Sequence, residues 1–485
     1  MSTISEKPRA SKLIRGQTQP SWITPWMLLV VVGVSAGLRL PGLVGFPFEQ
    51  DELYTLIEST ELFDSPLHPG IQARPLYYLL HHMVIEVLPQ THFGLRLPAL
   101  LFGVLGVWLT WVLGSRTIGD VGGLVAVLLV AISPWHMHAS GMARYWSLIY
   151  LLATAFYLCL HRASRTGLPH HYLSALLFLV LGAATHPAFV FPVLGAAVGL
   201  YMVGAGDRLR PSMPSRNAII YLWGPVGVGA LLLVGLLFIT NVQYHLRNFD
   251  GRGIHATLRL IPAMVQWMTP TIFAAGLLGS GLLLAESRGS HRQFGAMVVG
   301  GTCVALLFLF LASLVTDVYA DYGVAMLPLL FVSSGALVQL TVPRGAGRGY
   351  LPMWGMVAVL NVGVLPSTIS HLSDGTRFDH RPAFDEIRRK APELLVLTWP
   401  IVIQQRYAPE LHGRELIVSP SFLEEKLIKE RDFWAVISVQ RNGIVSDEGG
   451  DVQRWLNDNC TLSASHQRPR IDYRVYRTDL YRCRI

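Results

Sequence analysis

The sequence predicts an α-helical protein that crosses a membrane many times and carries a small α/β domain after its last span. Of its 485 residues, 52% are hydrophobic and only 14% are charged, and the mean hydropathy is +0.42. Soluble proteins carry about a quarter charged residues, so this deficit indicates a polytopic membrane protein. Long apolar runs fill the chain up to residue 367, whereas charges become frequent from His371 onward. The net charge of +8 does not indicate nucleic acid as a partner, because most of the basic residues lie in short clusters between apolar runs.

A spanning helix needs about 20 mostly apolar residues, and the apolar runs predict about eleven such helices. They lie near residues 22–40, 94–114, 121–138, 143–160, 172–187, 188–204, 218–240, 261–285, 295–316, 322–342 and 350–367. No A-x-A-like cleavage site follows the first run, so we treat it as a retained helix. We therefore expect a cytoplasmic tail at 1–21, a membrane domain at 22–367 whose first loop is 41–93, and a C-terminal domain at 368–485.

The basic residues between the spans predict the orientation. Alternate connections carry lysine or arginine, and the positive-inside rule places these connections in the cytoplasm. They are Lys7, Arg9, Lys12 and Arg15 in the tail, then Arg116, Arg162, Arg165, Arg208, Arg210, Arg216, Arg288, Arg292, Arg344 and Arg348. The N-terminus is then cytoplasmic, whereas the first loop and the C-terminal domain are extracytoplasmic.

Residues 74–89, "RPLYYLLHHMVIEVLP", are apolar but short, and they contain His81, His82 and Glu86. A span here would place the loop that contains Arg116 outside and break the charge pattern. We therefore predict a helix that lies on the external surface of the membrane.

The C-terminal domain shows strand and helix patterns in alternation. Residues 393–399, 415–419 and 433–439 have the composition of buried strands, and helical patterns lie between them and after them. This alternation predicts a small α/β domain with a largely parallel sheet. No G-x-G-x-x-G motif follows the first strand, so nucleotide binding is not indicated. Cys460 and Cys483 lie in this domain, where an oxidising compartment permits the disulfide that we expect between them.

Two adjacent carboxylates, Asp51 and Glu52, follow the first span directly. They could simply cap the next helix from a solvated turn. However, the apolar residues Phe46, Phe48 and Leu53 flank them, so the pair lies at the membrane interface, where desolvation perturbs a carboxylate. We therefore consider both as candidate catalytic residues.

Several arginines are expected on the same external side. Arg144 begins a membrane helix, where a charged residue is usually functional, although an arginine can also extend to the interface from such a position. The loop 241–260 contains Arg247, Arg252 and Arg259, against the positive-inside trend. Either the topology is misassigned there or the loop binds an anion, and the planar guanidinium is well suited to phosphate.

Three stretches in this region resemble a known family: "LRLPGLVGFPFEQDELYT", "RPLYYLLHH" and "FGLRLPALLFGVLGVWLTWVLGSRTIGDVGGLVAVLLVAISPWHMHASGMARYWSL". Their order and spacing are similar to the opening of the GT-C membrane glycosyltransferases, above all the branch that holds protein O-mannosyltransferases and lipid A aminoarabinose transferases. The likeness covers about residues 37–190. Beyond them it is one of layout, with more spans and an extracytoplasmic C-terminal domain.

The resemblance implies a sugar transferase that takes its sugar from a polyprenyl-phosphate donor in the bilayer, usually with inversion at the anomeric carbon. Asp51 would be the general base or would orient the acceptor, with Glu52 beside it. Arg74 and Arg144 match basic positions of the family and would bind the donor phosphate together with the 241–260 arginines. The acceptor would be an extracytoplasmic glycan, lipid or protein. The family likeness also favours a bacterial plasma (inner) membrane.

The chain departs from the family pattern at some positions. Met142 stands where relatives have a glutamate, Trp146 where they have a tyrosine, and Asp321-Tyr322 where they often have Arg-Tyr. Hard divalent cations need several oxygen ligands, and the lost glutamate leaves few of them. The sequence therefore names no certain cofactor and does not favour a metal ion.

The remaining candidates are residues that could contact the sugar. Aromatic rings can stack on sugar faces, although each of these rings could equally belong to an interfacial aromatic belt. A histidine in a membrane helix is more often a packing residue. The candidates are Tyr54, Tyr77, Tyr78, His138, Tyr145, Trp146 and His186.

Two other functions would also be compatible with the predicted spans and the site candidates. A transporter or flippase for a lipid-linked saccharide would also need many spans and basic external residues, but paired half-helices or repeats are not evident. A catalytically inactive envelope-assembly protein would fit the departures at Met142 and Asp321.

Overall fold

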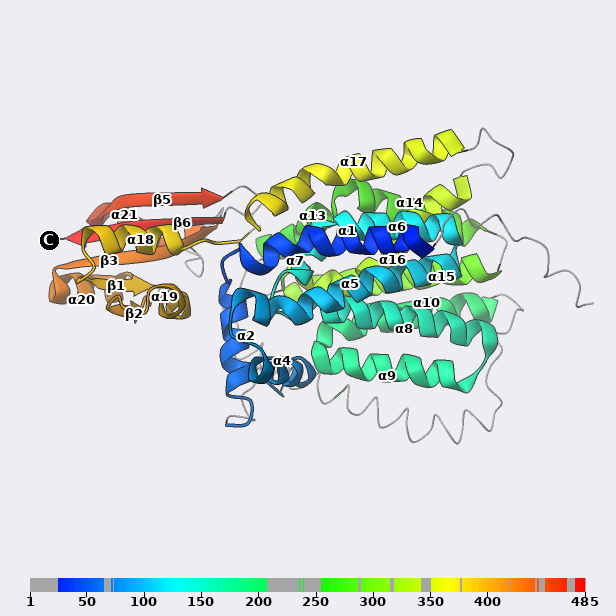
Figure 1. Cartoon of the computed structure of the whole chain (residues 1–485), viewed down its shortest axis with the longest axis horizontal. Coiled ribbons are helices and arrows are strands. Elements are labelled where there is room, and N and C mark those ends of the chain that lie inside the picture. The colour runs from blue at the N-terminus through cyan, green and yellow to red at the C-terminus, as the bar shows by residue number, and fades with distance from the viewer. Residues whose placement is uncertain are drawn as a thin grey trace, which may run out of the picture.

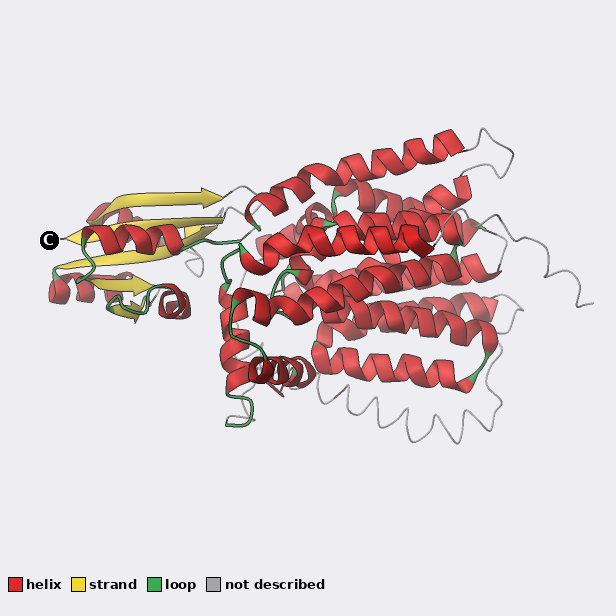
Figure 2. Ribbon diagram, in the orientation of Figure 1, coloured by secondary structure: helices red, strands yellow, loops and turns green. Residues whose placement is uncertain are grey.

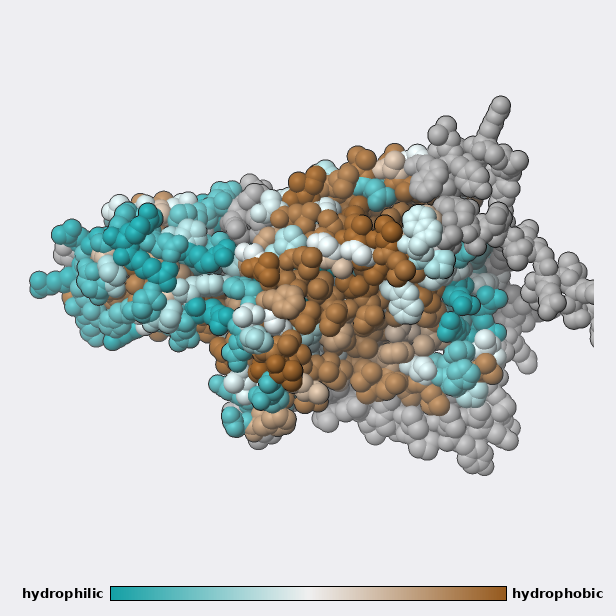
Figure 3. All heavy atoms as spheres, in the orientation of Figure 1, coloured by the Kyte–Doolittle hydropathy of each residue, from teal (hydrophilic) through white to brown (hydrophobic). Residues whose placement is uncertain are grey.

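The structure is a computed structural model with two parts, a helical bundle and a sheet domain at one end of the bundle (Figure 1). It describes residues 25–64, 71–72, 74–206, 235, 239, 254–286, 289–314, 318–341, 350–375, 377–417, 419–440, 443–444, 450–468 and 476–484. Hydrophobic residues cover the visible side of the bundle, whereas hydrophilic residues cover the C-terminal domain (Figure 3). This contrast is expected of a protein that is embedded in a membrane through the bundle alone.

Most of the long helices of the bundle lie side by side. They are α1 (Pro25–Val44), α5 (His92–Thr117), α6 (Asp120–Ile132), α8 (Trp146–Thr166), α9 (Pro169–Thr185), α10 (Val190–Gly206), α13 (Ile254–Met268), α14 (Pro270–Ala285), α15 (Gly289–Ser313), α16 (Leu327–Thr341) and α17 (Tyr350–Asp374). Among the described residues, six helices are long and apolar enough to cross a membrane, or up to eight if each bent pair is one span. The chain is a multi-pass membrane protein. The span expected at 218–240 lies almost wholly outside the described residues, and α17 extends past the expected boundary at 367.

Two expected spans are bent rather than continuous, and each bend lies at a proline. The run 121–138 divides into α6 and α7 (Pro134–Ser140), which meet at 63°, and the run 261–285 divides between α13 and α14, which meet at 94°. Proline removes a backbone donor and clashes with the preceding turn, so Pro134 and Pro270 each begin a new helix. At the first bend, Arg39 donates to the carbonyl oxygens of Val130 and Ala131, at 3.3 and 3.0 Å, in the last turn of α6.

Short elements close the end of the bundle next to the C-terminal domain. Helix α2 (Gln50–Thr60) and helix α4 (Pro75–Val87) lie across this end, in the first loop (Figure 1). Helix α4 forms where the sequence predicts a short surface helix, and it lies outside the long helices of the bundle (Figure 1). The boundary expected between the spans 172–187 and 188–204 is also present, because the 3-10 turn η1 (Pro187–Phe189) separates α9 from α10. A second such turn, η3 (Ala320–Met326), precedes α16.

The C-terminal domain contains a mixed sheet with helices on both faces (Figure 2). The described strands are β1 (Leu395–Thr398), β2 (Gly413–Glu415), β3 (Asp432–Gln440), β4 (Gly443–Ile444), β5 (Cys460–Arg468) and β6 (Tyr476–Arg484). Their order is β2-β1-β3-β6-β5, with β4 paired to β3. Helices α18 (Arg381–Lys390) and α19 (Ile401–Tyr407) cover one face, and α20 (Pro420–Glu430) and α21 (Asp451–Asn459) cover the other.

The expectation of a largely parallel sheet is wrong for half of this domain. Strand β1 is parallel to β2 and β3, but the pairings β3–β4, β3–β6 and β5–β6 are antiparallel. The predicted strand 415–419 is also displaced, since β2 is Gly413–Glu415. Strand β5 consists largely of small and polar residues and β6 contains four charged residues, so their sequences do not resemble buried strands.

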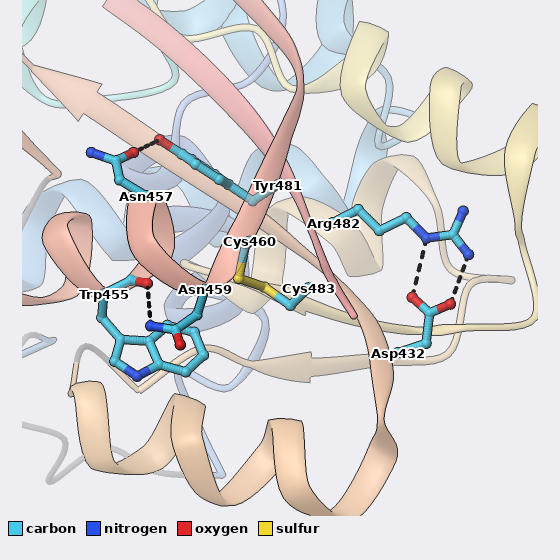
Figure 4. Close-up of a disulfide and its surroundings, with 8 residues drawn as sticks. All are labelled: Asp432, Trp455, Asn457, Asn459, Cys460, Tyr481, Arg482 and Cys483. Atoms are coloured by element: carbon cyan, nitrogen blue, oxygen red, sulfur yellow. Dashed lines mark hydrogen bonds and ion pairs between the residues drawn. A yellow bond between two sulfur atoms is a disulfide. The ribbon is translucent and has the colours of Figure 1, made fainter. Parts of the chain in front are cut away.

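The predicted disulfide is confirmed. Cys460 and Cys483 are bonded and join the antiparallel pair β5–β6, next to the ion pair between Arg482 and Asp432 (Figure 4). Cys159 and Cys303 are free.

Replacing both bonded cysteines, Cys460→Ser with Cys483→Ser, should lower the unfolding free energy of the C-terminal domain by about 3 kcal/mol, because the bond closes a loop of 23 residues in the unfolded chain. Denaturant unfolding of the full chain in detergent, followed by the exchange of backbone amides in β3, β5 and β6, measures this loss. Cys303→Ser is the matched control and should leave the midpoint unchanged. Equal stability of the double variant and the wild type would contradict the prediction.

Candidate active site

The expected site residues meet where α2 and α4 cross the end of the bundle. Asp51 and Glu52 lie in the first turn of α2, where the dipole of the helix stabilises negatively charged side chains. The irregular stretch between α7 and α8 presents Arg144 and Tyr145, and Arg74 directly precedes the first residue of α4. Three segments that are far apart in the sequence, at residues 51–52, 74 and 144–145, therefore form one site.

Arg144 is bound to the first turn of α2. Its Nη2 lies 3.2 Å from Asp51 Oδ2, and its Nη1 donates to the Asp51 carbonyl oxygen at 3.2 Å and to Thr55 Oγ1 at 3.0 Å. The Arg144 side chain is 8% exposed, whereas that of Asp51 is 55% exposed. A buried guanidinium thus lies beside a carboxylate that an incoming molecule can reach.

Arg74 and Arg144, the guanidinium pair, lie against the same aromatic ring. Their Cζ atoms are 5.1 and 4.8 Å from the centre of the Tyr145 ring, which provides cation–π contact to both. Arg74 is only 6% exposed. Its side chain has no ion pair or hydrogen bond among the described residues, and its Nε is buried. Arg144 has the carboxylate of Asp51 beside it, but Arg74 has no such anion among the described residues, and a buried cation without an anion is costly. The guanidinium pair is therefore suited to bind a further anion at Arg74.

Aromatic residues surround the guanidinium pair on the side of the bundle. The Tyr145 ring is 4.4 Å from Trp146 and 4.9 Å from His186, which begins the break between α9 and α10. Tyr322 of η3 lies 4.9 Å from His186 and 5.6 Å from Trp146. Irregular backbone at membrane depth is tolerated where it is buried in protein or lines a cavity, and here three such breaks supply Tyr145, His186 and Tyr322.

Tyr77 and Tyr78 of α4 complete the cluster. The Tyr77 ring is 5.7 Å from that of Tyr145. Burial raises the pKa of both phenols, so both remain protonated hydrogen-bond donors at neutral pH. The Tyr77 hydroxyl is buried and has no hydrogen-bond partner among the described residues, so it can donate to the same anion as the guanidinium pair.

Glu52, in contrast, lies inside the protein. It is 1% exposed, and its two oxygens accept bonds from Arg96 Nε and Nη2, each at 2.7 Å. They also accept from Arg377 Nη1 at 3.2 Å and from the Ala143 amide at 2.7 Å. Glu52, Arg96, Arg377 and the Ala143 amide are called the Glu52 cluster below.

The charges of this cluster keep Glu52 ionised. Burial alone would raise the pKa of Glu52, but Arg96, Arg377 and the Ala143 amide lower it by more, to about 2. Both oxygens are occupied and no acceptor can approach them. The expectation that Glu52 is catalytic beside Asp51 is therefore not consistent with its position, and its contacts are those of an internal anchor for the loop that carries Arg144.

Some expected residues lie elsewhere. His138 packs against Trp267 at 4.8 Å and His371 at 5.8 Å, apart from the Tyr145 cluster. Tyr54 is half-buried and lies near Glu415 of the C-terminal domain. Arg247 and Arg252 lie outside the described residues, as does the side chain of Arg259. No group of three or more His, Cys, Asp or Glu side chains that could hold a metal ion occurs within the described part of the chain.

Sequence reasoning missed two residues of the Glu52 cluster. Arg96 gave a usable signal, because it is a charge inside an apolar run. All five of its donors are used, since it also bonds the carbonyl oxygens of Gly42, Phe46 and Pro47. Arg377 gave none, because it lies in a charged stretch between α17 and α18.

Comparisons with known proteins indicate the fold of the chain. The sequence model of the family described as dolichyl-phosphate-mannose-protein mannosyltransferase matches residues 67–238. This stretch contains Arg74, Arg144 and His186 and begins after Asp51. No curated protein matches the chain at a significant level.

Solved structures match far more of the chain. ArnT from Cupriavidus metallidurans, bound to undecaprenyl phosphate, is similar over 94% of this chain and 98% of that chain, with a TM-score of 0.54 and 14% identity. The chain has the GT-C fold. The GT-C similarity extends to the apo oligosaccharyltransferase of Archaeoglobus fulgidus, with a TM-score of 0.53 and 12% identity over 86% of this chain and 70% of that chain. AglB from the same organism, in complex with an inhibitory peptide and a dolichol-phosphate, matches the same shares with a TM-score of 0.50 and 11% identity.

Proposed function

We propose that this protein transfers a sugar from a polyprenyl-phosphate donor to an extracytoplasmic glycan, lipid or protein, with inversion at the anomeric carbon. The observation that carries the proposal is the buried guanidinium pair around Tyr145, in contact with the accessible carboxylate of Asp51. Arg74 has no anionic partner among the described residues, and a lipid phosphate at the membrane boundary supplies one.

The lipid part and the polar part of the donor lie in different environments. Its polyprenyl chain stays in the bilayer, its phosphate accepts hydrogen bonds from Arg74, Arg144 and Tyr77, and its sugar lies beside Tyr145 and Trp146. Guanidinium groups and phosphate oxygens form strong charge-assisted bonds. Solved relatives support this class of ligand, since ArnT is bound to undecaprenyl phosphate and AglB to a dolichol-phosphate.

The transfer step follows from the charges that develop. The acceptor oxygen attacks the anomeric carbon, and the bond between that carbon and the phosphate oxygen breaks with its electron pair. Polyprenyl phosphate leaves with one more negative charge, which Arg74 and Arg144 stabilise more strongly than the charge of the bound donor. The acceptor hydroxyl gives its proton to the Asp51 carboxylate as attack proceeds, and water removes that proton afterwards.

We infer that the first loop and the C-terminal domain face away from the cytoplasm, at the plasma (inner) membrane of a bacterium. The positive-inside pattern supports this orientation. The disulfide between Cys460 and Cys483 supports it independently, because such bonds persist in oxidising compartments.

The experiment uses purified full-length protein and undecaprenyl-phosphate hexoses that carry a label in the sugar, with a membrane extract as a mixed acceptor. We expect protein-dependent release of undecaprenyl phosphate and recovery of the label in another molecule. Intact donor that instead moves between the leaflets of sealed vesicles would contradict the proposal and favour a flippase.

A further inference from the structure

We propose that Arg377 is a positioning residue that aligns the transfer site, so that the site is competent only while the C-terminal domain is docked on the first loop. This inference rests on the proposed function and extends it. Arg377 lies just before α18, at the start of the C-terminal domain, and is fully buried.

The bonds of Arg377 lead mainly to the first loop rather than into its own domain. Its Nη1 donates to Glu52 Oε2 and to the Pro47 carbonyl oxygen, both at 3.2 Å. Its guanidinium lies 5.5 Å from the centre of the Phe46 ring. Its Nε donates to the nearby Gly375 carbonyl oxygen at 3.3 Å. The entry to the C-terminal domain is therefore bound to the segment 46–52.

Glu52 connects Arg377 with the active site. Its Oε1 accepts from the Ala143 amide at 2.7 Å, and Ala143 directly precedes Arg144. Asp51, next to Glu52, is paired with Arg144 at 3.2 Å. A change at Arg377 thus acts through one carboxylate on both neighbours, Asp51 and Arg144, that the proposed transfer step uses.

Neutralising Glu52 does not require Arg377. Arg96 binds both carboxylate oxygens at 2.7 Å, shorter than the 3.2 Å contact of Arg377. Arg377 Nη2 is buried without a hydrogen-bond partner among the described residues. A second buried guanidinium beside a paired carboxylate adds desolvation cost, and apolar residues often stabilise such positions equally well. The role of Arg377 is better explained as a connection between the C-terminal domain and the first loop.

Contacts other than those of Arg377 also hold the C-terminal domain against the first loop. Phe48, Leu53 and Leu95 share one buried cluster with Ala383 and Phe384 of α18. In addition, Arg406 of α19 donates to the Gln90 carbonyl oxygen at 2.8 Å. Arg377→Met keeps the apolar part of the side chain, so the domains should remain packed while the bond to Glu52 is lost.

The experiment compares Arg377→Met, the conservative Arg377→Lys and the control Arg389→Met, an exposed arginine of α18 that bonds within its own helix. We expect Arg377→Met to lower kcat about 10- to 100-fold, as small misplacements of reacting groups do. The KM for undecaprenyl-phosphate hexose should change less than kcat, and Arg377→Lys should restore part of the rate. Thermal unfolding checks that each variant is folded.

Hydrogen exchange gives a second readout that does not depend on catalysis. Arg377→Met should speed amide exchange in residues 141–146, where Ala143 bonds Glu52, and Arg389→Met should not. If kcat and exchange of Arg377→Met match those of the wild type, the inference is wrong. If the wild type transfers no sugar, the proposed function fails, and the exchange comparison alone still supports or overturns the coupling.

Discussion

Asp51→Asn should reduce kcat for sugar transfer by about 100- to 10,000-fold, the range that general base catalysis contributes. Asparagine keeps the shape of the side chain but cannot accept the acceptor proton. Arg144 should stay in place, because it also donates to the residue 51 carbonyl oxygen and to Thr55 Oγ1. Steady-state kinetics with labelled donor measures kcat, and equilibrium binding of undecaprenyl phosphate should remain within a few-fold of wild type.

Glu61→Gln is the matched control, since Glu61 is an exposed acid at the other end of α2. It should leave kcat unchanged. Near-native turnover of Asp51→Asn would show that another group takes the proton.

Glu52→Gln should lower the unfolding free energy by about 3–5 kcal/mol, the usual consequence of breaking a buried ion pair from one side. The change leaves Arg96 and Arg377 buried with no negative partner in the cluster. Thermal unfolding in detergent measures the loss, again with Glu61→Gln as the control. A Glu52→Gln variant as stable as wild type would contradict the structural role assigned to this carboxylate.

The same carboxylate predicts a pH dependence. The pKa of Glu52 is lowered from 4.5 to about 2 in the folded protein, so its ionised form stabilises the fold at pH values above the unfolded pKa. This contribution, on the order of 3 kcal/mol, should be lost as the pH falls from about 4.5 toward 2. The stability difference between wild type and Glu52→Gln should shrink over this window. A difference that stays constant down to pH 2 would count against an ionised Glu52.

The sequence predicted the parts of this architecture that follow from composition and local pattern. Apolar length predicted most of the described helices, and the loop charges and short length of 74–89 predicted that α4 is not one of the spans. Placing the first loop and Arg144 on one side of the membrane predicted that Asp51 and Arg144 meet, and their side chains lie 3.2 Å apart.

Other features depend on how the chain folds back on itself. Asp51 and Glu52 are neighbours in sequence, but successive side chains of a helix point about 100° apart, and only the packing of α2 decides which one is buried. Arg377 reaches Glu52 across a separation of 325 residues, which no local pattern encodes. The prolines at 134 and 270 were visible, yet the apolar length of both runs favoured continuous spans.

Equilibrium binding of undecaprenyl phosphate and of the uncharged undecaprenol, to wild-type protein and to Arg74→Gln, tests the guanidinium pair most directly. The account predicts that the wild type prefers the phosphate, and that Arg74→Gln weakens phosphate binding by roughly 10- to 150-fold, the value of a hydrogen bond to a charged group, while undecaprenol binding is unchanged. Equal affinity of the wild type for both lipids, or unaltered phosphate binding by Arg74→Gln, would contradict it.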